Sequence, residues 1–400
     1  MSTPSIAPYL PSRRVRCTEQ SFGASNDVTL NLAPDRRWAP RCSGCGEVAR
    51  QVHSSYTREV RDLGLGAHRV TLRLHPRRLR CRRCQRISAE HFDFVELSVR
   101  VTKRLARAVA GLCKILPLSD VAEFFGLDWK LVKRCDQAVL QEQFSGTRTK
   151  GLRLLAIDEI SIKKGQRFLT IVLDYETGRV VWVGEGHSYE TLSSFFALMS
   201  SEERNAIEAV AIDMWDPFEK AIRKHLPRAR VVYDLFHVVA AYHRQVLDEV
   251  RTSAYRRAND PEERRFIKRS RFLLYSNTAT LRPKQKPRLE ELLRVNQEIA
   301  TAYVLRDSLK EIWATRSPWQ ARAALRTWCR LATESRIPAL VKFARMLRRR
   351  ERGIVTHAAY PIHTSRLEGV NNKIKVIKRR SYGFHDPEYF ALKVKQAFPG

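Results

Sequence analysis

Three short segments decide the fold that this sequence predicts: LRLLAIDE at 152–159, RFLTIVLDY at 167–175 and RVVWVGEG at 179–186. The first is mostly apolar, the second and third are rich in β-branched and aromatic residues, and all three are bounded by turn-like stretches, which is typical of β-strands. Helical and strand patterns alternate after them, in the order YETLSSFFALM (189–199), AVAIDM (209–214), FEKAIRKHL (218–226) and ARVVYDLFH (229–237). A three-strand meander followed by strand–helix alternation predicts an α/β domain with a mixed sheet.

This order of elements is that of the ribonuclease H-like fold, so we expect residues 151–237 to form the first part of such a core. Residues 238–355 read as helical and basic throughout, which predicts an all-helical insertion. Residues 356–400, with a helix from Ser365, would close the core. The tryptophans of the insertion are expected to pack in its interior, with stacking on a nucleic-acid base as the alternative; they are Trp313, Trp319 and Trp328.

The residues before the core divide into three further regions. Residues 1–41 read as an irregular arm, 42–92 hold two cysteine pairs and many arginines, and 103–143 have helical periodicity. The polar stretch SGTRTKG at 145–151, flanked by glycines, predicts a linker to the core. We therefore expect a zinc-binding region and a helical region in front of the α/β core.

The charge of the chain indicates a polyanionic partner. Its 73 Lys and Arg against 42 Asp and Glu leave a net charge of +31. Such an excess repels itself in a compact fold unless a polyanion neutralises it, and nucleic acid is the usual one. An anionic membrane is the alternative, but no stretch is long and apolar enough to cross a bilayer. The N-terminus lacks a secretory h-region, so we expect a soluble, cytoplasmic protein that binds double-stranded DNA and no membrane.

Four cysteines form two C-x2-C pairs, Cys42 with Cys45 and Cys81 with Cys84. Two such pairs supply the four thiolates of a tetrahedral structural Zn²⁺ site. Two coincidental pairs of buried thiols are the alternative. Doubled C-x2-C is among the stronger short motifs, so we predict structural zinc here.

Residues 118–140, LSDVAEFFGLDWKLVKRCDQAVL, have the pattern of a helix, a turn at Gly126 and a second helix that begins near Asp128. The second helix carries Lys130, Lys133 and Arg134, where a recognition helix would meet DNA. A helical hairpin that only packs on its neighbours has the same apolar spacing. The basic surroundings favour a DNA-binding helix-turn-helix.

Two strand patterns end on an aspartate in the same way: LLAIDE on Asp158 and AVAIDM on Asp213. If these strands pair side by side, their carboxylates lie about one strand spacing apart, roughly 5 Å. Divalent ions can share such a pair, whereas buried like charges without a cation are costly. An aspartate at a strand end is more often a turn former or a helix cap, which is the alternative.

Several segments together resemble the ISL-three family of bacterial insertion-sequence transposases. They are CSGCG (42–46) with CRRC (81–84), AIDE (156–159), AIDMWDPF (211–218), VVYDLFHV (231–238), SRLEGVNNKIKVIKRRSYGF (365–384) and FALKVKQAF (390–398). The resemblance runs from about Cys42 to the C-terminus, and the block around EGVNNKIK is its most specific part.

This resemblance implies a DNA transposase with a DDE core, which binds terminal inverted repeats and then cleaves and joins DNA strands. It implies a catalytic triad of Asp158, Asp213 and Glu368 that holds two Mg²⁺ ions, with Mn²⁺ as an in vitro substitute. Asp234 and His237 match a D-x2-H signature that follows the second aspartate in several such families, so we treat them as supporting residues. Assembly as a homo-oligomer on element ends and target DNA is also implied. The alternatives are a catalytically silent DNA-binding regulator and a nuclease that cuts without joining.

Glu368 has a second interpretation, because Ser365-Arg-Leu-Glu368 also fits the S-x-x-E capping box that opens a helix. In that case Glu368 is structural rather than catalytic. The helix that follows is basic and is expected to follow a DNA backbone with these side chains: Lys373, Lys375, Lys378, Arg379 and Arg380.

Overall fold

The computed structural model describes residues 14–23, 26–95, 100–146, 149–163, 167–276, 281–363, 365–381 and 386–400. Its contacts divide the chain into two compact units, Met1–Ser145 with Lys378–Lys393 and Gly146–Ile377 with Val394–Gly400. The first change of unit falls in the polar stretch 145–151 that the sequence predicts as a linker. Residues 1–13 of the expected arm and 382–384 of the EGVNNKIK block lie outside the described residues.

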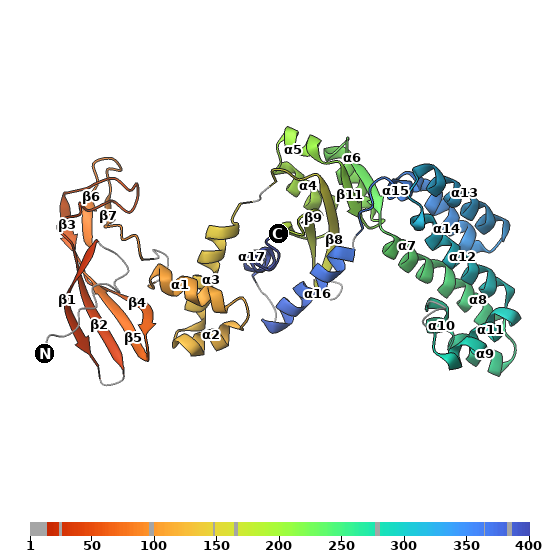
Figure 1. The fold of residues 1–400 in the computed structure, drawn as a ribbon, viewed down its shortest axis with the longest axis horizontal. Helices are drawn as coiled ribbons and strands as arrows, with labels where there is room; N and C mark the ends of the chain where they lie inside the picture. The colour runs from red at the N-terminus through yellow and green to blue at the C-terminus, as the bar shows by residue number, and fades with distance from the viewer. Residues whose placement is uncertain are drawn as a thin grey trace. The chain divides into compact units, whose positions relative to one another are not determined.

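A four-stranded sheet of order β1-β2-β5-β4 begins the first unit (Figure 1). Its strands are β1 (Val15–Phe22), β2 (Asp27–Pro34), β4 (Arg58–Leu65) and β5 (His68–Leu74). The prediction of an irregular arm over 1–41 is therefore wrong for the two strands between 15 and 34. Val28, Leu30 and Leu32 are buried on one face of β2, which is the period-two pattern of a half-buried strand.

A smaller antiparallel sheet, β3-β6-β7, carries the region of the cysteine pairs. Its strands are β3 (Val52–Ser55), β6 (Arg77–Arg80) and β7 (Ile87–Ala89). Leu79 of β6 is fully buried and packs with Cys42 and Cys81 in a small apolar cluster. The sheet thus brings together two cysteine pairs that are far apart in the sequence.

Three helices follow, α1 (Lys103–Leu112), α2 (Leu118–Phe125) and α3 (Trp129–Phe144), and they confirm the helical prediction for 103–143. They pack around a buried cluster that includes Val109, Val121 and Val132. Gly126 ends α2 at φ +60°, a left-handed conformation that only glycine adopts without strain. The predicted turn between the second and third helices is therefore present.

Helix α17 (Pro387–Ala397) joins this helical group through a buried polar network. The Tyr389 hydroxyl and the Lys393 ammonium donate to the same oxygen of Asp136 on α3, over 2.5 and 3.0 Å. A buried carboxylate is tolerated when it is paired and hydrogen-bonded in this way. The contacts group Lys378–Lys393 with the first unit, whereas the sequence-based division assigns all of 356–400 to the core.

The second unit contains a five-stranded sheet of order β10-β9-β8-β11-β12 (Figure 1). Its strands are β8 (Leu154–Lys163), β9 (Arg167–Asp174), β10 (Val180–Glu185), β11 (Ala209–Ile212) and β12 (Arg230–Tyr233). The first three run antiparallel, while β11 is parallel to both β8 and β12. The strands predicted from LRLLAIDE onward are confirmed, so the mixed α/β class is as predicted.

Helices α4 (Tyr189–Ala197), α5 (Ser201–Ala206) and α6 (Asp216–His225) lie between the third and fifth strands in the sequence. Helix α4 contacts β10 and α6, and α6 contacts β11. The segment ARVVYDLFH differs from its prediction as a single strand: the strand ends at Tyr233, and Asp234 caps the next helix by accepting from the Phe236 N–H. An N-cap aspartate satisfies a helix N–H that would otherwise have no partner.

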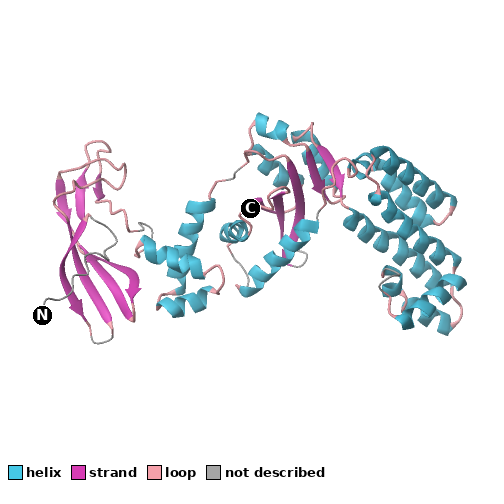
Figure 2. Ribbon diagram, in the orientation of Figure 1, coloured by secondary structure: helices cyan, strands magenta, loops and turns pink. Residues whose placement is uncertain are grey.

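The insertion predicted over 238–355 is helical, as Figure 2 shows. Its helices are α7 (Leu235–Tyr242), α8 (Asp248–Arg257), α9 (Pro261–Lys268), α10 (Arg271–Tyr275), α11 (Lys286–Val295), α12 (Gln297–Ala314), α13 (Pro318–Glu334), α14 (Pro338–Arg349) and α15 (Glu351–Thr356). One cluster of buried hydrophobic residues contains side chains of the five-stranded sheet and of the insertion helices, from Leu152 to Val355 in sequence. The sheet and the insertion therefore share a core. Trp328 is buried and Trp313 partly buried, whereas Trp319 is 75% exposed.

Candidate active site and zinc centre

Asp158 and Asp213 occupy equivalent places on two paired strands. Strands β8 and β11 are parallel, and Ala211 lies opposite Ala156. Each aspartate follows its alanine by two positions, so the same register brings Asp213 level with Asp158. The two strands therefore pair side by side, which is the condition under which the sequence predicts neighbouring carboxylates. Together with His237, the two aspartates offer ligand atoms that all lie within 4.8 Å of one another.

The Asp158 carboxylate is buried at the centre of this group. One of its oxygens accepts from the Glu159 N–H and the other from the Asn371 side-chain amide, both over 2.7 Å. Burial, and next the charge of Asp213, raise the pKa of Asp158 to about 6, although His237 and the two hydrogen bonds oppose this shift. The site therefore holds a carboxylate whose charge the surrounding protein does not fully compensate.

His237 reaches the group from the first turn of α7, and its Nε2 lies 2.6 Å from Asp213 Oδ1. Burial disfavours the charged imidazole, but the hydrogen bond to Asp213 and the charge of that carboxylate outweigh it and raise the pKa of His237. Asp234, the other supporting residue, caps α7 and is not one of the residues grouped within 4.8 Å in the described part of the chain. Of the two residues of the D-x2-H signature, His237 therefore belongs to the group with Asp158 and Asp213, whereas Asp234 does not.

Glu368 lies in the first turn of α16 (Ser365–Arg380), and its side chain is exposed. Among the described residues it is not in the group with Asp158 and Asp213. Asn371, one helical turn further along α16, is the residue whose amide reaches Asp158. Asn371 is not among the site residues predicted from the sequence, although it follows Glu368 by three positions and residues three apart on a helix lie on the same face.

The donor atoms of this group fit a divalent cation. Two carboxylates this close repel each other, and an ion between them removes the repulsion. Carboxylate oxygens are the hard ligands that Mg²⁺ and Mn²⁺ prefer, and an imidazole nitrogen adds a ligand that suits Mn²⁺ better than Mg²⁺. The charge of Asp213 contributes to the raised pKa of both Asp158 and His237, although burial is the larger cause at Asp158.

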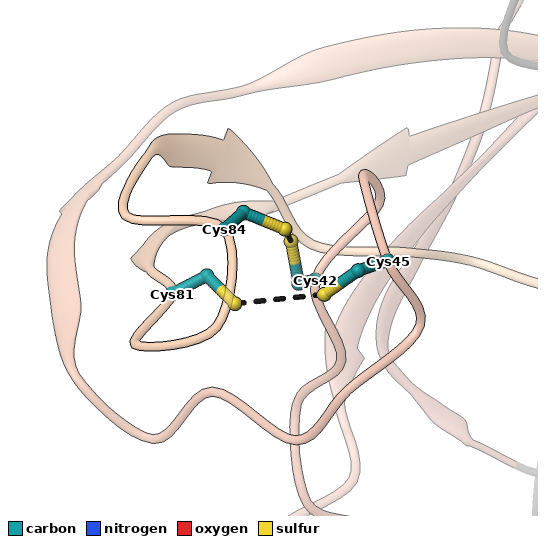
Figure 3. A group of neighbouring side chains, drawn as sticks. All are labelled: Cys42, Cys45, Cys81 and Cys84. Atoms are coloured by element: carbon teal, nitrogen blue, oxygen red, sulfur yellow. Dashed lines mark hydrogen bonds between the residues drawn. The ribbon is translucent and has the colours of Figure 1, made fainter.

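The four paired cysteines converge in the first unit, as Figure 3 shows. Cys42 Sγ lies 4.0 Å from Cys84 Sγ, and Cys45 Sγ lies 3.6 Å from Cys81 Sγ. A tetrahedral zinc ion with Zn–S bonds of about 2.3 Å requires sulfurs roughly 3.8 Å apart. The predicted cysteines therefore have the spacing of a zinc site.

The hydroxyl of Ser88, 2.9 Å from Cys42 Sγ, supports the thiolate form of that residue. This hydrogen bond is the main reason that the pKa of Cys42 is lowered to about 6. The pKa of Cys84 is raised to about 12, mainly by its interaction with Cys45 and then by burial and the other sulfurs. Four sulfurs cannot all be deprotonated at this distance without a cation, and zinc supplies that charge.

We expect protein purified without added metal to contain about one zinc ion per chain, because four thiolates bind structural zinc tightly. Cys81→Ser should lose most of that zinc, while Cys17→Ser, which changes a cysteine outside the cluster, should keep it. Elemental analysis of the three proteins measures this directly. A zinc content near zero in the unmodified protein, or one that Cys81→Ser leaves unchanged, would exclude this centre.

The basic side chains predicted to bind DNA divide according to their contacts within the protein. Three of them make hydrogen bonds within the protein: Lys133 with Asp386, Lys373 with the Ala397 carbonyl, and Arg380 with the carbonyls of residues 114 and 115. Lys378 is half-buried, and the exposed side chains are those of Lys130, Arg134, Lys373, Lys375 and Arg379. The exposed side chains have the access that a phosphate contact needs.

Comparison with known proteins adds independent evidence. A family model described as a transposase, that of the ISL3 group, matches residues 155–394. A second model, described as the zinc-finger of transposase IS204/IS1001/IS1096/IS1165, matches residues 38–84 and includes all four clustered cysteines. In the described part of the chain, no helix combines the length and the apolar character needed to cross a membrane.

Two transposases are similar to this chain over most of their length. The transposase for insertion sequence element IS1001 of Bordetella parapertussis is 43% identical over 360 residues, which cover 90% of this chain and 89% of that protein. The transposase for insertion sequence element IS1557 of Mycobacterium tuberculosis is 26% identical over 398 residues, which cover 92% and 88%. The similarity therefore extends across both the region of the four cysteines and the second unit.

Proposed function

The chain belongs to the ISL3 family of insertion-sequence transposases and contains its zinc ribbon, and from this premise we propose a specific reaction. The protein binds the terminal inverted repeats of an insertion sequence and carries out metal-dependent cleavage and strand transfer of DNA. The observation that carries this proposal is the level placement of Asp158 and Asp213 on parallel strands, with His237 beside them.

We assign the second unit to the ribonuclease H-like class with a helical insertion. Three antiparallel strands, followed by two strands parallel to the first of them, support this assignment. The carboxylates lie on the central strand β8 and directly after its neighbour β11. The parallel register brings Asp158, in the middle of β8, level with Asp213, directly after the end of β11, which suits a site that must hold a phosphodiester.

In this proposal Asp158, Asp213 and Glu368 hold two Mg²⁺ ions. When bound, such ions make the attacking oxygen nucleophilic and neutralise the leaving oxygen. Asn371 orients Asp158 through its amide, and His237 orients Asp213 through Nε2. Water is the first nucleophile and the freed 3′-hydroxyl the second, so no side chain needs to bond covalently to DNA.

DNA binding is assigned to the first unit and to the basic side of α16. The helices α2 and α3 with the turn at Gly126 support a helix-turn-helix, in which Lys130 and Arg134 are exposed on the second helix. The zinc ribbon adds a rigid basic surface, and a net charge of +31 matches a partner of many phosphates. Double-stranded element ends and target DNA are the proposed partners, and pairing of two ends calls for a homo-oligomer.

A strand-transfer assay tests the whole proposal. The substrate is the DNA that flanks this gene, where imperfect inverted repeats would mark the element ends. With Mg²⁺ the protein should cut at these ends and join the freed 3′ ends to a target plasmid. Cutting without joining would indicate a nuclease instead, and specific binding without cutting would indicate a silent regulator.

A further inference from the structure

A cavity of about 640 Å³ lies beside the proposed active site in the second unit. Its walls come from the start of β9, the end of β10, the loop into α4 and the start of α6. The residues that line it and carry the argument are Arg167, Phe168, Glu185, His187, Tyr189 and Trp215. Ligand sites in proteins commonly have volumes of about 300–1,000 Å³, so the cavity is large enough for a small organic group.

Four of the residues that line the cavity carry aromatic rings, and Trp215 is held in one orientation by a hydrogen bond. Trp215 is 40% exposed, and its indole N–H donates to the His187 carbonyl over 3.0 Å, which fixes the orientation of the ring. The His187 ring centre lies 5.6 Å from that of Trp215 and 4.3 Å from that of Phe168. A tryptophan that is oriented in this way and partly exposed can act as a stacking platform for a flat ring.

Two of the lining residues are close neighbours of the proposed catalytic group. The backbone N–H of Trp215 donates to the Asp213 carbonyl over 2.7 Å, so the tryptophan belongs to the turn that follows this aspartate. On the other side His187 Nδ1 lies 3.8 Å from a carboxylate oxygen of Glu159, the residue after Asp158. A nucleotide next to a phosphate held by the two aspartates would therefore reach the cavity.

The turn between β10 and α4, which forms part of the cavity wall, is also constrained. Gly186 has φ +98°, and a Cβ at this position would lie 2.6 Å from the Thr191 hydroxyl, so a larger residue would be strained there. Thr170 donates to the Gly186 carbonyl over 2.7 Å and ties this turn to β9. These contacts restrict the backbone of this part of the wall.

The charges of the cavity select a neutral occupant rather than a phosphate. Arg167 is paired with Glu185 over 2.7 Å, which cancels the basic side chain at the rim. Glu190 adds negative charge to the lining, and Glu159 adds more beside His187, while Arg167 is the one Lys or Arg among the described lining residues. A phosphate would be repelled here, whereas the π face of a base carries no charge and its amino groups can donate to carboxylates.

We propose that this cavity receives one unpaired nucleobase of the DNA substrate, stacked on Trp215 next to the phosphate at the catalytic aspartates. The inference rests on the proposed function, because a nucleotide lies next to this cavity only if a DNA phosphate is held at the two aspartates. Enzymes that act on DNA draw single bases out of the stack, and aromatic stacking repays part of that cost for any base. The occupant is thus defined by shape and stacking, with no specified sequence.

The test uses a DNA duplex with a short single-stranded 3′ overhang that carries 2-aminopurine, a base whose fluorescence is quenched by stacking. Full-length protein is titrated without added magnesium, so that nothing is cut. Quenching is expected for the unmodified protein. Trp215→Ala should lose the quenching and bind the overhang duplex about 10- to 100-fold more weakly, since one base stack contributes an affinity factor of that order.

Three comparisons make the result specific. Trp215→Phe keeps an aromatic face and should retain part of the quenching, which would show that the loss in Trp215→Ala is not a folding defect. Trp319→Ala removes a tryptophan that is 75% exposed in the insertion and should behave like the unmodified protein. A blunt duplex without the overhang should bind Trp215→Ala and the unmodified protein equally.

Two outcomes would overturn the inference. The first is full quenching by Trp215→Ala, equal to that of the unmodified protein. The second is loss of quenching in Trp319→Ala, which would place the stacking site in the insertion. Either result would leave the proposed function intact, because strand transfer is measured separately with the element ends. Failure of the unmodified protein to cut and join those ends would refute the proposed function itself.

Discussion

Asp213→Asn and Asp158→Asn should each reduce Mg²⁺-dependent cleavage and strand transfer by at least about 10³-fold. Loss of one metal ligand removes several kcal/mol of transition-state stabilisation, and each 1.36 kcal/mol is a factor of ten in rate. Asparagine keeps the size of the side chain and an acceptor oxygen, but not the charge that a divalent ion needs. Single-turnover cleavage of labelled element ends measures the loss.

DNA binding and fold should survive in both variants, which thermal melting and a gel-shift assay can verify. Because the amide removes the repulsion between the two carboxylates, the melting temperature without added metal should not fall. Asp216→Asn is the matched control: Asp216 lies three residues after Asp213, but its side chain is 68% exposed and pairs with Arg350 at the surface. Its cleavage rate should stay near normal. Near-normal cleavage by Asp213→Asn would show that the catalytic metal is not bound at this part of the sheet.

Glu368→Gln is the second decisive change, with an expected loss of cleavage and strand transfer of about the same size. Glutamine can serve at a helix N-terminus but lacks the charge of a metal ligand, so it separates the catalytic interpretation from the capping one. Glu368 is exposed and lies one turn before Asn371 on α16. Asn371 contacts Asp158, so Glu368 lies on the same side of the helix as the residue that reaches the site. Binding to element ends should be unchanged.

Glu388→Gln provides the control for this experiment, since Glu388 is also an exposed glutamate in the first turn of a helix. That variant should cut normally. If Glu368→Gln also cut at a normal rate, the third ligand would lie elsewhere. His237, which the structure places within 4.8 Å of both aspartates, would then be the first candidate ahead of Asp234, whose carboxylate caps α7.

The sequence by itself was sufficient wherever the signal is local. The period-two pattern of LLAIDE and AVAIDM identified two strands and put an aspartate at the same place in each, so their pairing followed from a shared pattern. The two C-x2-C pairs likewise identified the cysteines of the zinc site, because each pair lies in one short turn and its two thiols are only three positions apart in the sequence. The helical insertion was also visible from its periodicity.

The tertiary structure alone decided which side chains meet across long distances in the chain. Asn371 reaches Asp158, and His237 rather than Asp234 joins the aspartates, because the packing of α16 and α7 on the sheet fixes which helix faces point inward. The cavity beside Trp215 likewise depends on a loop that starts after β10 and on the turn after β11. Such contacts result from the burial of many distant apolar residues in one core, and no short window of sequence contains that information.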